Sequence, residues 1–526
     1  MQGSTPDANP EPTSRPTPAP ASEPYDVAVI GAGPAGLAGA VTASELGLTV
    51  ALLDSAPGPG GQFYRHPHPA AGATRPEALH HDWPVFAALR DRLAAGSVDR
   101  LFGHHVWTVT RRSDDDWTVH ALTGEDGADA DTDDRHPVTV RARAILLATG
   151  AGERQLPFPG WTLPGVVGAG GAQAMLKSGL ALPGRRIVVA GSGPLLLATA
   201  SSLTAAGAHV PEIVEASSYL GYAAHPGVLA ANPGKLAEAA LHGTAFLRDR
   251  VRLRTRSAVI EAHGTDRVEA VTVARLDRDW RPVPGTARRI RCDALAVGHG
   301  LIPRIETATA LGCATRRTAD GTHALALSPL QETSLRGMWA AGETGGIGGA
   351  QLAITEGALA ALAITARRTG RMPAPRVAPQ LPGSSVPLRA LRTLRRRRDR
   401  MRAFAEAMAL AHAPRPGWTD WLTDDTDVCR CEEVPAGRVR EAVAEYGARD
   451  ARTVKLLTRA GMGWCQGRVC DAAVTCLAAE ATGTRAGTPA RPAATPPPPR
   501  LPLSTPIPLG TLASLPVPDA TEGHAS

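Results

Sequence analysis

The chain has 526 residues, more than one ordinary hydrophobic core holds, so roughly two to four domains are expected. Its net charge of +6 is mild, and the basic run 392–398 contains no aromatic side chain that could stack on a base, so nucleic-acid binding is not expected. We expect neither a signal peptide nor a membrane span. Four of the seven cysteines gather at 429–470, which is typical of metal binding in a reducing compartment, so the predicted location is cytoplasmic.

Residues 25–54 contain the first predicted unit, a strand, a glycine turn, a helix and a second strand. The turn follows the apolar stretch VAVI with the pattern G-x-G-x-x-G, and consists of Gly31, Ala32, Gly33, Pro34, Ala35 and Gly36. Glycines allow a close approach of the backbone to a pyrophosphate at the helix N-terminus. Asp54 ends the second strand, next to Ser55, where an acid can bind ribose hydroxyls. We therefore predict a dinucleotide site; the alternative is a glycine turn without a ligand.

Two further stretches help to decide which dinucleotide binds here. The segment after the second strand brings Gly61 and Gln62 close to where a flavin ring would lie. A predicted strand then ends in Ala-Thr-Gly, with Thr149 and Gly150 at its carboxyl end. These positions favour FAD over NAD as the ligand of the first unit.

A third stretch, 337–343, is a predicted strand that ends at Gly342 and Glu343, and a helix is expected to begin near Gln351. The N-terminal dipole of that helix could stabilise negative charge on a reduced flavin. These residues resemble the two-dinucleotide-binding flavoproteins, the group of the glutathione and thioredoxin reductases. In that group a Gly-Asp pair binds the ribityl chain and pyrophosphate, so the resemblance implies the same role for Gly342 and Glu343. The Glu in place of Asp is a departure from the family pattern.

Residues 185–216 repeat the same order of elements, which indicates an internal duplication of the dinucleotide-binding motif. The turn has Gly191 and Gly193, but Leu196 replaces the third glycine and implies a wider helix–strand spacing. Glu215 ends the next strand and favours NAD or another adenine nucleotide such as ATP. A working NAD(P)H site, a nucleotide without redox chemistry and a retained scaffold all stay open. Outside the C-terminal cysteine cluster the chain has only Cys292, Cys313 and Cys476, and none of them is paired with disulfide-reductase spacing, so that chemistry is not expected.

Four cysteines near the C-terminus have the pattern C-x-C followed by C-x4-C: Cys429, Cys431, Cys465 and Cys470. Four thiolates satisfy a [2Fe–2S] cluster, and each pair can come from one loop. Gly461, Gly463 and Gly467 keep the second loop open and leave backbone N–H groups free to bond sulfur. A structural zinc site is the alternative, but this is not the usual zinc-ribbon spacing. We predict the cluster, with two short helices between the cysteine pairs.

The cysteine module resembles the bacterioferritin-associated ferredoxin-like [2Fe–2S] domain. A wider resemblance, over about residues 25–480, is to the FAD/[2Fe–2S] large subunits of heteromeric amine dehydrogenases, and rests on RQLPFPGWTLPGVVGAGGAQ, AGSGPLLL and KLLTRAGMGWCQGRVC. That group includes opine oxidase, hydrogen cyanide synthase, D-hydroxyproline dehydrogenase and dye-linked proline dehydrogenase. The resemblance implies a hetero-oligomer in which a D-amino-acid-oxidase-like flavoprotein subunit oxidises the substrate. This chain would relay the electrons to an acceptor and would need no catalytic base or nucleophile.

The predicted fold class is α/β, a flavoprotein with an inserted NAD-type Rossmann domain and a small C-terminal [2Fe–2S] domain. The expected ranges are an FAD domain at 25–158 and 289–370, a second dinucleotide-binding domain at 159–288, a basic connector at 371–424, a cluster domain at 425–482 and disordered tails at 1–24 and 483–526. The connector is expected to contain one helix with a solvated or docking face. A second hypothesis is a self-sufficient NAD(P)H-dependent flavin reductase that passes electrons through its cluster to an acceptor protein.

Overall fold

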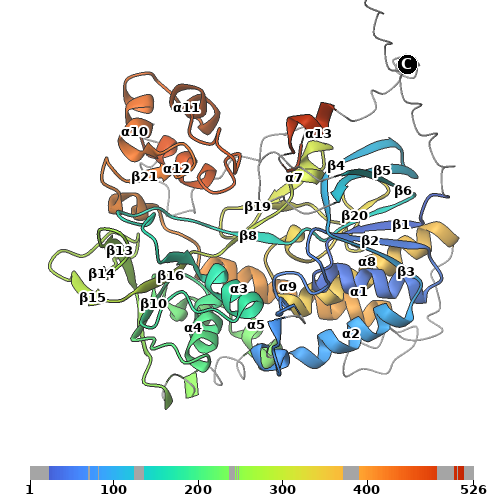
Figure 1. Ribbon diagram of the computed structural model, residues 1–526, viewed down its shortest axis with the longest axis horizontal. Coiled ribbons are helices and arrows are strands. Elements are labelled where there is room, and N and C mark those ends of the chain that lie inside the picture. Colours follow the sequence, from blue (N-terminus) through green and yellow to red (C-terminus); the bar gives the residue numbers. More distant parts are fainter. Residues whose placement is uncertain are drawn as a thin grey trace, which may run out of the picture.

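The computed structural model describes residues 23–68, 71–80, 82–123, 136–235, 243–244, 246, 248–370, 390–481, 503–505 and 507–513. These residues form two domains with parallel sheets, a helical C-terminal module and a long helix that packs along the first domain (Figure 1). Residues 371–389 of the predicted connector, and most of the two predicted tails, lie outside the described residues.

The first domain is built on a five-stranded parallel sheet in the order β20-β7-β1-β2-β3. Its strands are β1 (Val27–Ile30), β2 (Val50–Asp54), β3 (Val98–Phe102), β7 (Ile145–Leu147) and β20 (Met338–Ala340). One face of the sheet is covered by α1 (Pro34–Glu45) and α8 (Ala350–Thr369), with α2 (Trp83–Ala95) beside α1. The other face is covered by the antiparallel strands β4 (His104–Ser113), β5 (Asp116–Thr123) and β6 (His136–Ala142). Because both faces are covered, the central strands are continuous apolar runs.

Small residues set the spacing between α1 and α8. A side chain at Gly357 would place its Cβ less than 3.0 Å from the carbonyl oxygen of Ala35, in the first turn of α1. A Cβ at Gly39 would come equally close to the side chain of Leu146 in the sheet. The two helices can therefore lie this close together only with glycine at position 357, because the atom that its Cβ would meet belongs to the backbone.

The second domain repeats this plan with a parallel sheet in the order β12-β11-β10-β16-β9. Its elements are β9 (Val166–Gly168), α3 (Ala169–Gly179), β10 (Ile187–Gly191), α4 (Leu195–Ala205), β11 (Glu212–Glu215), β12 (Arg252–Thr255), the meander β13 (Ser257–His263), β14 (Ala270–Arg275) and β15 (Arg288–Arg291), and β16 (Ala294–Gly298). The predicted boundary at residue 288 falls too early, because β16 returns to this sheet and pairs with β10. The antiparallel pair β8 (Ala151–Glu153) and β17 (Leu301–Pro303) then links the domains.

The C-terminal module contains α10 (Ala436–Ala444), α11 (Ala451–Thr458), α12 (Asp471–Ala481) and the short strands β21 (Asp427–Cys429) and β22 (Val434–Pro435). The two helices predicted between the cysteine pairs are α10 and α11. The indole N–H of Trp421 donates to the carbonyl oxygen of Trp280 at 2.9 Å, and Arg281 lies 3.1 Å from Asp420. The module and the segment that leads into it are therefore fixed to the second domain.

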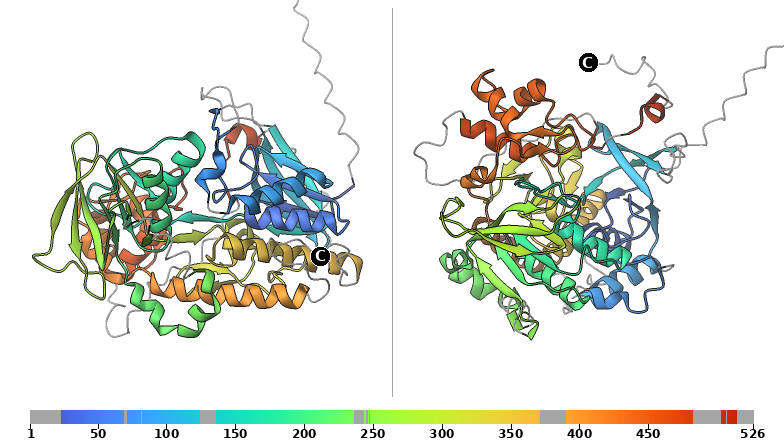
Figure 2. Two further views of the ribbon diagram at one scale, coloured as in Figure 1. Left: turned by 90° about the horizontal axis from the view of Figure 1, so that it is seen from below. Right: turned by 60° about the vertical axis from the view of Figure 1, so that its left-hand side comes forward.

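The connector helix α9 (Ala390–Ala411) packs against α8, and Figure 2 shows the two helices lying alongside each other. Leu394 is buried in this contact, and Ala405 and Ala407 of the same helix are also buried, while the arginines at 392, 395 and 396 are exposed. The solvated face predicted for this helix is thus one side of it. Arg402, about two helical turns after Arg395, is buried, which the basic run did not suggest.

Part of the C-terminal region predicted to be disordered has a defined place in the structure. The backbone N–H of Ser504 donates to the carbonyl oxygen of Trp107 at 2.9 Å, and the short helix α13 (Leu509–Ala513) follows. Trp107 lies at a bulge in β4, where the register with β5 shifts, so its carbonyl can accept from another segment. Across the described part of the chain, no helix is long and apolar enough to cross a membrane.

Candidate functional site

The first glycine turn connects β1 to α1 and has no room for side chains at two of its positions. Gly31 has φ +105°, and a Cβ there would lie less than 3.0 Å from the carbonyl oxygen of Ala148. A Cβ at Gly36 would clash in the same way with the carbonyl oxygen of Gly31. Gly33 is the N-cap of α1 and offers no side-chain cap, so N–H groups in the first turn are left for a ligand. This backbone fits a dinucleotide pyrophosphate.

Asp54 ends β2 and fixes the glycine turn through hydrogen bonds. Its carboxylate accepts from the backbone N–H of Ala32 at 2.6 Å and from that of Ala56 at 2.8 Å. Burial raises the pKa of Asp54, and the two N–H donors act against that rise. Ser55 beside it is exposed. The acid predicted to bind ribose therefore also holds the turn that would face the pyrophosphate.

Gly61 and Gln62 follow in the loop beyond β2. A Cβ at Gly61 would lie 2.7 Å from the Cα of Gly33, so this loop closes directly over the glycine turn. The amide oxygen of Gln62 accepts from Arg65 at 2.9 Å, and the Gln62 side chain is exposed. Gly61 thus lies beside the glycine turn, and the side chain of Gln62 contacts Arg65 of the same loop; their place near a flavin ring stays a prediction.

Lys177 was not found from the sequence, and it connects this loop to the second domain. It lies on α3, is only 8% exposed, and its Nζ donates to the carbonyl oxygen of Phe63 at 3.1 Å. Burial lowers the pKa of Lys177 to about 8. A lone lysine near the end of a small, Gly/Ala-rich helix gave no signal for a contact with another domain.

Thr149 and Gly150 lie at the carboxyl end of β7, next to the glycine turn. The hydroxyl of Thr149 donates to the carbonyl oxygen of Arg304 at 2.6 Å, and the backbone N–H of Arg304 donates to the carbonyl oxygen of Gly150 at 2.9 Å. Gly150 has φ +73°, with no atom within 4 Å of where its Cβ would stand. The segment that leaves the first domain after β7 and the segment that returns to it after β17 are therefore hydrogen-bonded to each other at this edge of the sheet.

Gly342 and Glu343 follow β20 and lead into α8. The Glu343 carboxylate accepts from the backbone N–H groups of Gly348 at 2.6 Å and Gly349 at 3.0 Å, so it closes the loop that precedes the helix. Burial raises the pKa of Glu343 against these two bonds. Gln351, in the first turn of α8, is exposed and donates to Asp82 at 3.4 Å. The longer Glu side chain thus reaches its own loop; its role toward FAD stays a prediction.

A buried ion pair behind this loop was missed from the sequence. Glu356 of α8 is 0% exposed and lies 2.5 Å from Arg402 of α9. The same carboxylate accepts from the backbone N–H of Gly342 at 3.0 Å, and Arg402 donates to the carbonyl oxygen of Gly346 at 2.6 Å. The pair therefore holds both ends of the loop 342–346. A single acid in the apolar stretch of α8 was the available signal.

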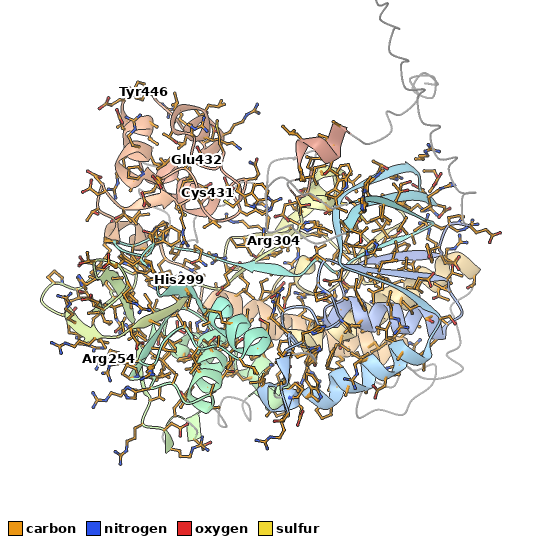
Figure 3. All side chains as sticks on the ribbon, in the orientation of Figure 1. Arg254, His299, Arg304, Cys431, Glu432 and Tyr446 are labelled. Atoms are coloured by element: carbon orange, nitrogen blue, oxygen red, sulfur yellow. The ribbon has the colours of Figure 1, made fainter. Side chains whose placement is uncertain are left out.

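The four cysteines of the C-terminal module come together between β21 and α12. Cys429 and Cys470 are buried, Cys465 is partly exposed and Cys431 is exposed. Cys431 lies in hydrogen-bonding contact with Cys465, and Cys470 with Cys429. Burial and the neighbouring thiols raise the pKa of Cys470. Figure 3 labels Cys431 in this module and Arg304 in the region toward the first domain.

The loop around the cysteines fits a two-iron cluster. A Cβ at Gly463 would lie less than 3.0 Å from the Cβ of Cys431, and the backbone N–H of Gly461 donates to the sulfur of Cys429 at 3.4 Å. Among the described residues, no three His, Cys, Asp or Glu side chains are arranged to hold a single metal ion. Two sulfur pairs side by side suit a [2Fe–2S] cluster, in which two thiolates serve each iron, better than one tetrahedral zinc.

Comparisons with known proteins agree with both sites. Residues 25–357 match the model of the pyridine nucleotide-disulphide oxidoreductases, and residues 428–480 match the BFD-like [2Fe-2S] binding domain. The chain belongs to the pyridine nucleotide-disulphide oxidoreductase family. It is an FAD-dependent oxidoreductase with a C-terminal [2Fe–2S] domain, as the sequence predicted.

Individual relatives cover most of the chain. Hydrogen cyanide synthase subunit HcnB of Pseudomonas aeruginosa is 34% identical over 458 residues, which span 84% of this chain and 90% of that protein. An opine oxidase subunit of Agrobacterium tumefaciens is 34% identical over 459 residues, 86% of this chain and 85% of the relative. L-proline dehydrogenase from P. horikoshii has the same fold, with a TM-score of 0.62 at 19% identity over 93% of this chain and 79% of that chain. The predicted α/β fold class is confirmed.

The second glycine turn of this oxidoreductase copies the first in its hydrogen bonds. Gly191 has φ +133°, and a Cβ there would lie less than 3.0 Å from the carbonyl oxygen of Gly298. Glu215 accepts from the backbone N–H groups of Gly193 at 3.0 Å and Ser217 at 2.9 Å, as Asp54 does in the first unit. The internal duplication thus extends to the acid that holds the turn.

The two units differ in what covers the acid. Glu215 is 0% exposed, and the imidazole of His412, just beyond α9, lies 3.5 Å from its carboxylate. The other ring nitrogen of His412 lies 3.1 Å from the hydroxyl of Tyr222, and its carbonyl oxygen accepts from Ser192 at 3.1 Å. Although burial acts to raise it, His412 and the N–H donors hold the pKa of Glu215 below its ordinary value. The end of the connector therefore closes over the acid expected to bind ribose.

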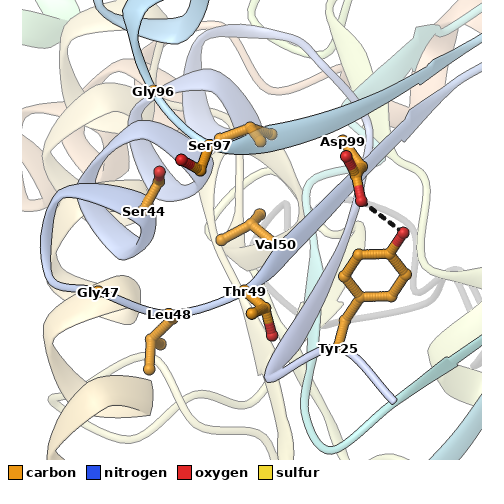
Figure 4. Close-up of a pocket in the computed structure, with 10 residues that line it drawn as sticks. Tyr25, Ser44, Gly47, Leu48, Thr49, Val50, Gly96, Ser97 and Asp99 are labelled. Atoms are coloured by element: carbon orange, nitrogen blue, oxygen red, sulfur yellow. Dashed lines mark hydrogen bonds between the residues drawn. The ribbon is translucent and has the colours of Figure 1, made fainter. Parts of the chain in front are cut away.

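A cavity of about 590 Å³ in the first domain lies away from these sites (Figure 4). It is lined by the residues that open β1, β2 and β3, so it is at the amino ends of the strands, opposite the glycine turn. The hydroxyl of Tyr25 donates to Asp99 at 2.6 Å there, and this bond raises the pKa of Tyr25 to about 12. Ligands of open α/β sheets bind at the carboxyl ends of the strands, so this cavity is not the nucleotide site.

Proposed function

We propose that this chain is the electron-relay subunit of a heteromeric amine or amino-acid dehydrogenase with an opine-like substrate. FAD supplies two-electron chemistry and a [2Fe–2S] cluster one-electron chemistry, so the two together can divide an electron pair. Two relatives, HcnB and the opine oxidase protein, are subunits by name, which supports a hetero-oligomer. In this proposal a D-amino-acid-oxidase-like flavoprotein subunit oxidises the substrate, and an acceptor takes electrons from the cluster.

The observation that carries the proposal is the closure over Glu215. A self-sufficient reductase needs NAD(P)H in the second domain, with its ribose at this acid. Both carboxylate oxygens already accept backbone N–H bonds, and His412 covers the group from the side of the connector. Asp54 makes the same two backbone bonds but remains partly exposed. The contrast between matched units favours nucleotide binding in the first domain and disfavours a pyridine nucleotide as the electron source.

The remaining thiols give no support to disulfide chemistry beside the flavin. Cys292 and Cys313 are both buried. Burial raises the pKa of Cys292 to about 12 and also raises that of Cys313. A thiol held protonated is a poor nucleophile, so we interpret both as core residues. The cluster module is thus the better candidate for the next carrier of electrons.

The test compares the isolated chain with the complex. Alone, with FAD and cluster loaded, the chain should show little or no dye reduction with amino acids or opines and little or no oxidation of NADH. Co-expression with a D-amino-acid-oxidase-like subunit should produce substrate-dependent dye reduction. Full turnover of an amino acid by the isolated chain would overturn the relay proposal, and NADH-driven reduction of a dye would support the reductase instead.

A further inference from the structure

A carboxylate lies between the flavin domain and the cluster module. Glu306 opens α7 (Glu306–Ala310), and its side chain is 18% exposed. It lies 3.3 Å from the guanidinium of Arg304, in the segment just after β17, and 3.3 Å from that of Arg468. Arg468 is part of the loop between Cys465 and Cys470. One acid thus joins an arginine from each of two units that are far apart in sequence.

Each arginine is bound to a site by its other contacts. The backbone of Arg304 is hydrogen-bonded to Thr149 and Gly150, at the end of β7 beside the glycine turn. The guanidinium of Arg468 donates to the carbonyl oxygen of Cys465 at 3.2 Å. Continuous polar contacts therefore run from the edge of the flavin site through Glu306 to the backbone of a cluster ligand.

The C-terminal segment is attached at the same point. Arg468 also donates to the carbonyl oxygen of Ser504. The hydroxyl of Ser504 donates in turn to the carbonyl oxygen of Trp107, in β4 of the flavin domain, at 2.7 Å. Arg468 is 14% exposed, and its guanidinium therefore holds the cluster loop to the flavin domain along two routes. Figure 1 shows α13 and α7 near each other, on the side of the flavin domain that carries β4.

We propose that Glu306 and Arg468 are positioning residues that hold the cluster loop against the flavin domain and so set how fast electrons pass from FAD to the [2Fe–2S] cluster. The inference rests on the proposed relay function and deepens it. Electron transfer between two centres slows as their separation grows, so a loosened loop slows it. The Trp280–Trp421 and Arg281–Asp420 contacts fix the module to the second domain and lie outside this loop. Val469 of the loop packs against the second-domain core, whereas Glu306 and Arg468 tie the loop to the flavin domain.

The variants are Glu306→Gln and Arg468→Lys, compared with Asp420→Asn, which breaks an ion pair of the segment leading into the same module on its second-domain side. FAD in the purified holoprotein is photoreduced, and the optical and EPR signals of the cluster are then followed with time. Their appearance gives the transfer rate, because the flavin loses one electron and the cluster gains it. Hydrogen exchange over residues 461–470 reports how firmly the loop is held, independently of redox activity.

Glu306→Gln should lower the transfer rate and should raise hydrogen exchange over residues 461–470. Arg468→Lys keeps the positive charge but loses the branched guanidinium. Its transfer rate and its hydrogen exchange should therefore lie between those of the wild type and those of Glu306→Gln. Asp420→Asn should keep the wild-type rate, with iron and FAD contents equal in all proteins. Wild-type rate and exchange in Glu306→Gln would overturn the inference. If the wild-type cluster accepts no electrons from FAD, the relay proposal fails instead, and the exchange data still decide whether Glu306 holds the loop.

Discussion

Replacement of Arg402 by Met should destabilise the flavin domain, because it leaves a buried carboxylate without its main partner. The Glu356 side chain is 0% exposed and the Arg402 side chain 11% exposed, with 2.5 Å between the paired atoms. Met retains much of the aliphatic stem of Arg and removes the charge. The perturbation therefore tests the ion pair rather than the packing of α9 on α8.

The magnitude follows from what remains around Glu356. Removal of one partner from a buried ion pair costs about 3–5 kcal/mol. The backbone N–H of Gly342 still donates to the carboxylate, and the guanidinium of Arg398 lies 3.6 Å away. These contacts soften the loss, so we expect a decrease of about 3 kcal/mol in the free energy of unfolding. The affinity for FAD should also fall, because the bond from Arg402 to Gly346 no longer holds the loop.

Urea unfolding followed by the release of flavin fluorescence measures the stability, and titration of the apoprotein with FAD measures the affinity. Arg395 is exposed on the same helix, and Arg395→Met should change stability by no more than about 0.5 kcal/mol. The double variant Glu356→Gln with Arg402→Met removes both charges and should recover most of the loss. An Arg402→Met protein within about 1 kcal/mol of Arg395→Met, with unchanged FAD affinity, would refute the reasoning.

Three further changes test the separate sites. Gly36→Ala should abolish FAD binding, because the new Cβ would clash with the backbone of its own turn, whereas Gly58→Ala meets open space and should bind FAD as the wild type does in a fluorescence titration. His299 follows β16 and is 3% exposed, and burial lowers its pKa from 6.5 to about 4, so the folded protein holds this proton less tightly than the unfolded chain. Its contribution to stability is full above pH 6.5 and is lost as the pH falls from 6.5 toward 4. His299→Gln should flatten that part of the stability curve, and an unchanged slope would contradict burial as the cause. Cys465→Ser should remove iron and acid-labile sulfide but keep FAD, whereas Cys476→Ser should keep the cluster and FAD. Stoichiometric zinc in anaerobically prepared wild-type protein would contradict the cluster.

Features that depend on neighbours in sequence could be predicted. Gly36 is required by a contact with Gly31, five residues earlier in the same turn, and an apolar strand with an acid at the end of the next strand frames the turn. The cysteine pattern is also local, since C-x-C and C-x4-C each lie within six residues of sequence. The domain types, the cofactors and the two helices of the module follow from such short stretches.

Features that depend on distant parts of the chain could not be predicted. Glu356 contacts Arg402, which lies 46 positions further along the chain. His412, which covers Glu215, comes after the whole second domain in sequence. The single acid in the apolar stretch of α8 indicates that Glu356 needs a partner but not which residue supplies it, and no residue near Glu215 in sequence points to His412. The early domain boundary has the same origin: β16 is an apolar strand, and only its pairing shows which sheet it joins.

The most direct test of the relay is to follow the cluster by rapid-freeze EPR under anaerobic conditions, with two possible electron sources. One sample mixes the isolated chain with NADH, and the other mixes the complex of both subunits with its amino-acid or opine substrate. We predict a reduced-cluster signal within a single turnover of the complex, and none from NADH with the isolated chain. Reduction of the cluster by NADH in the isolated chain, with no signal from substrate in the complex, would contradict the relay.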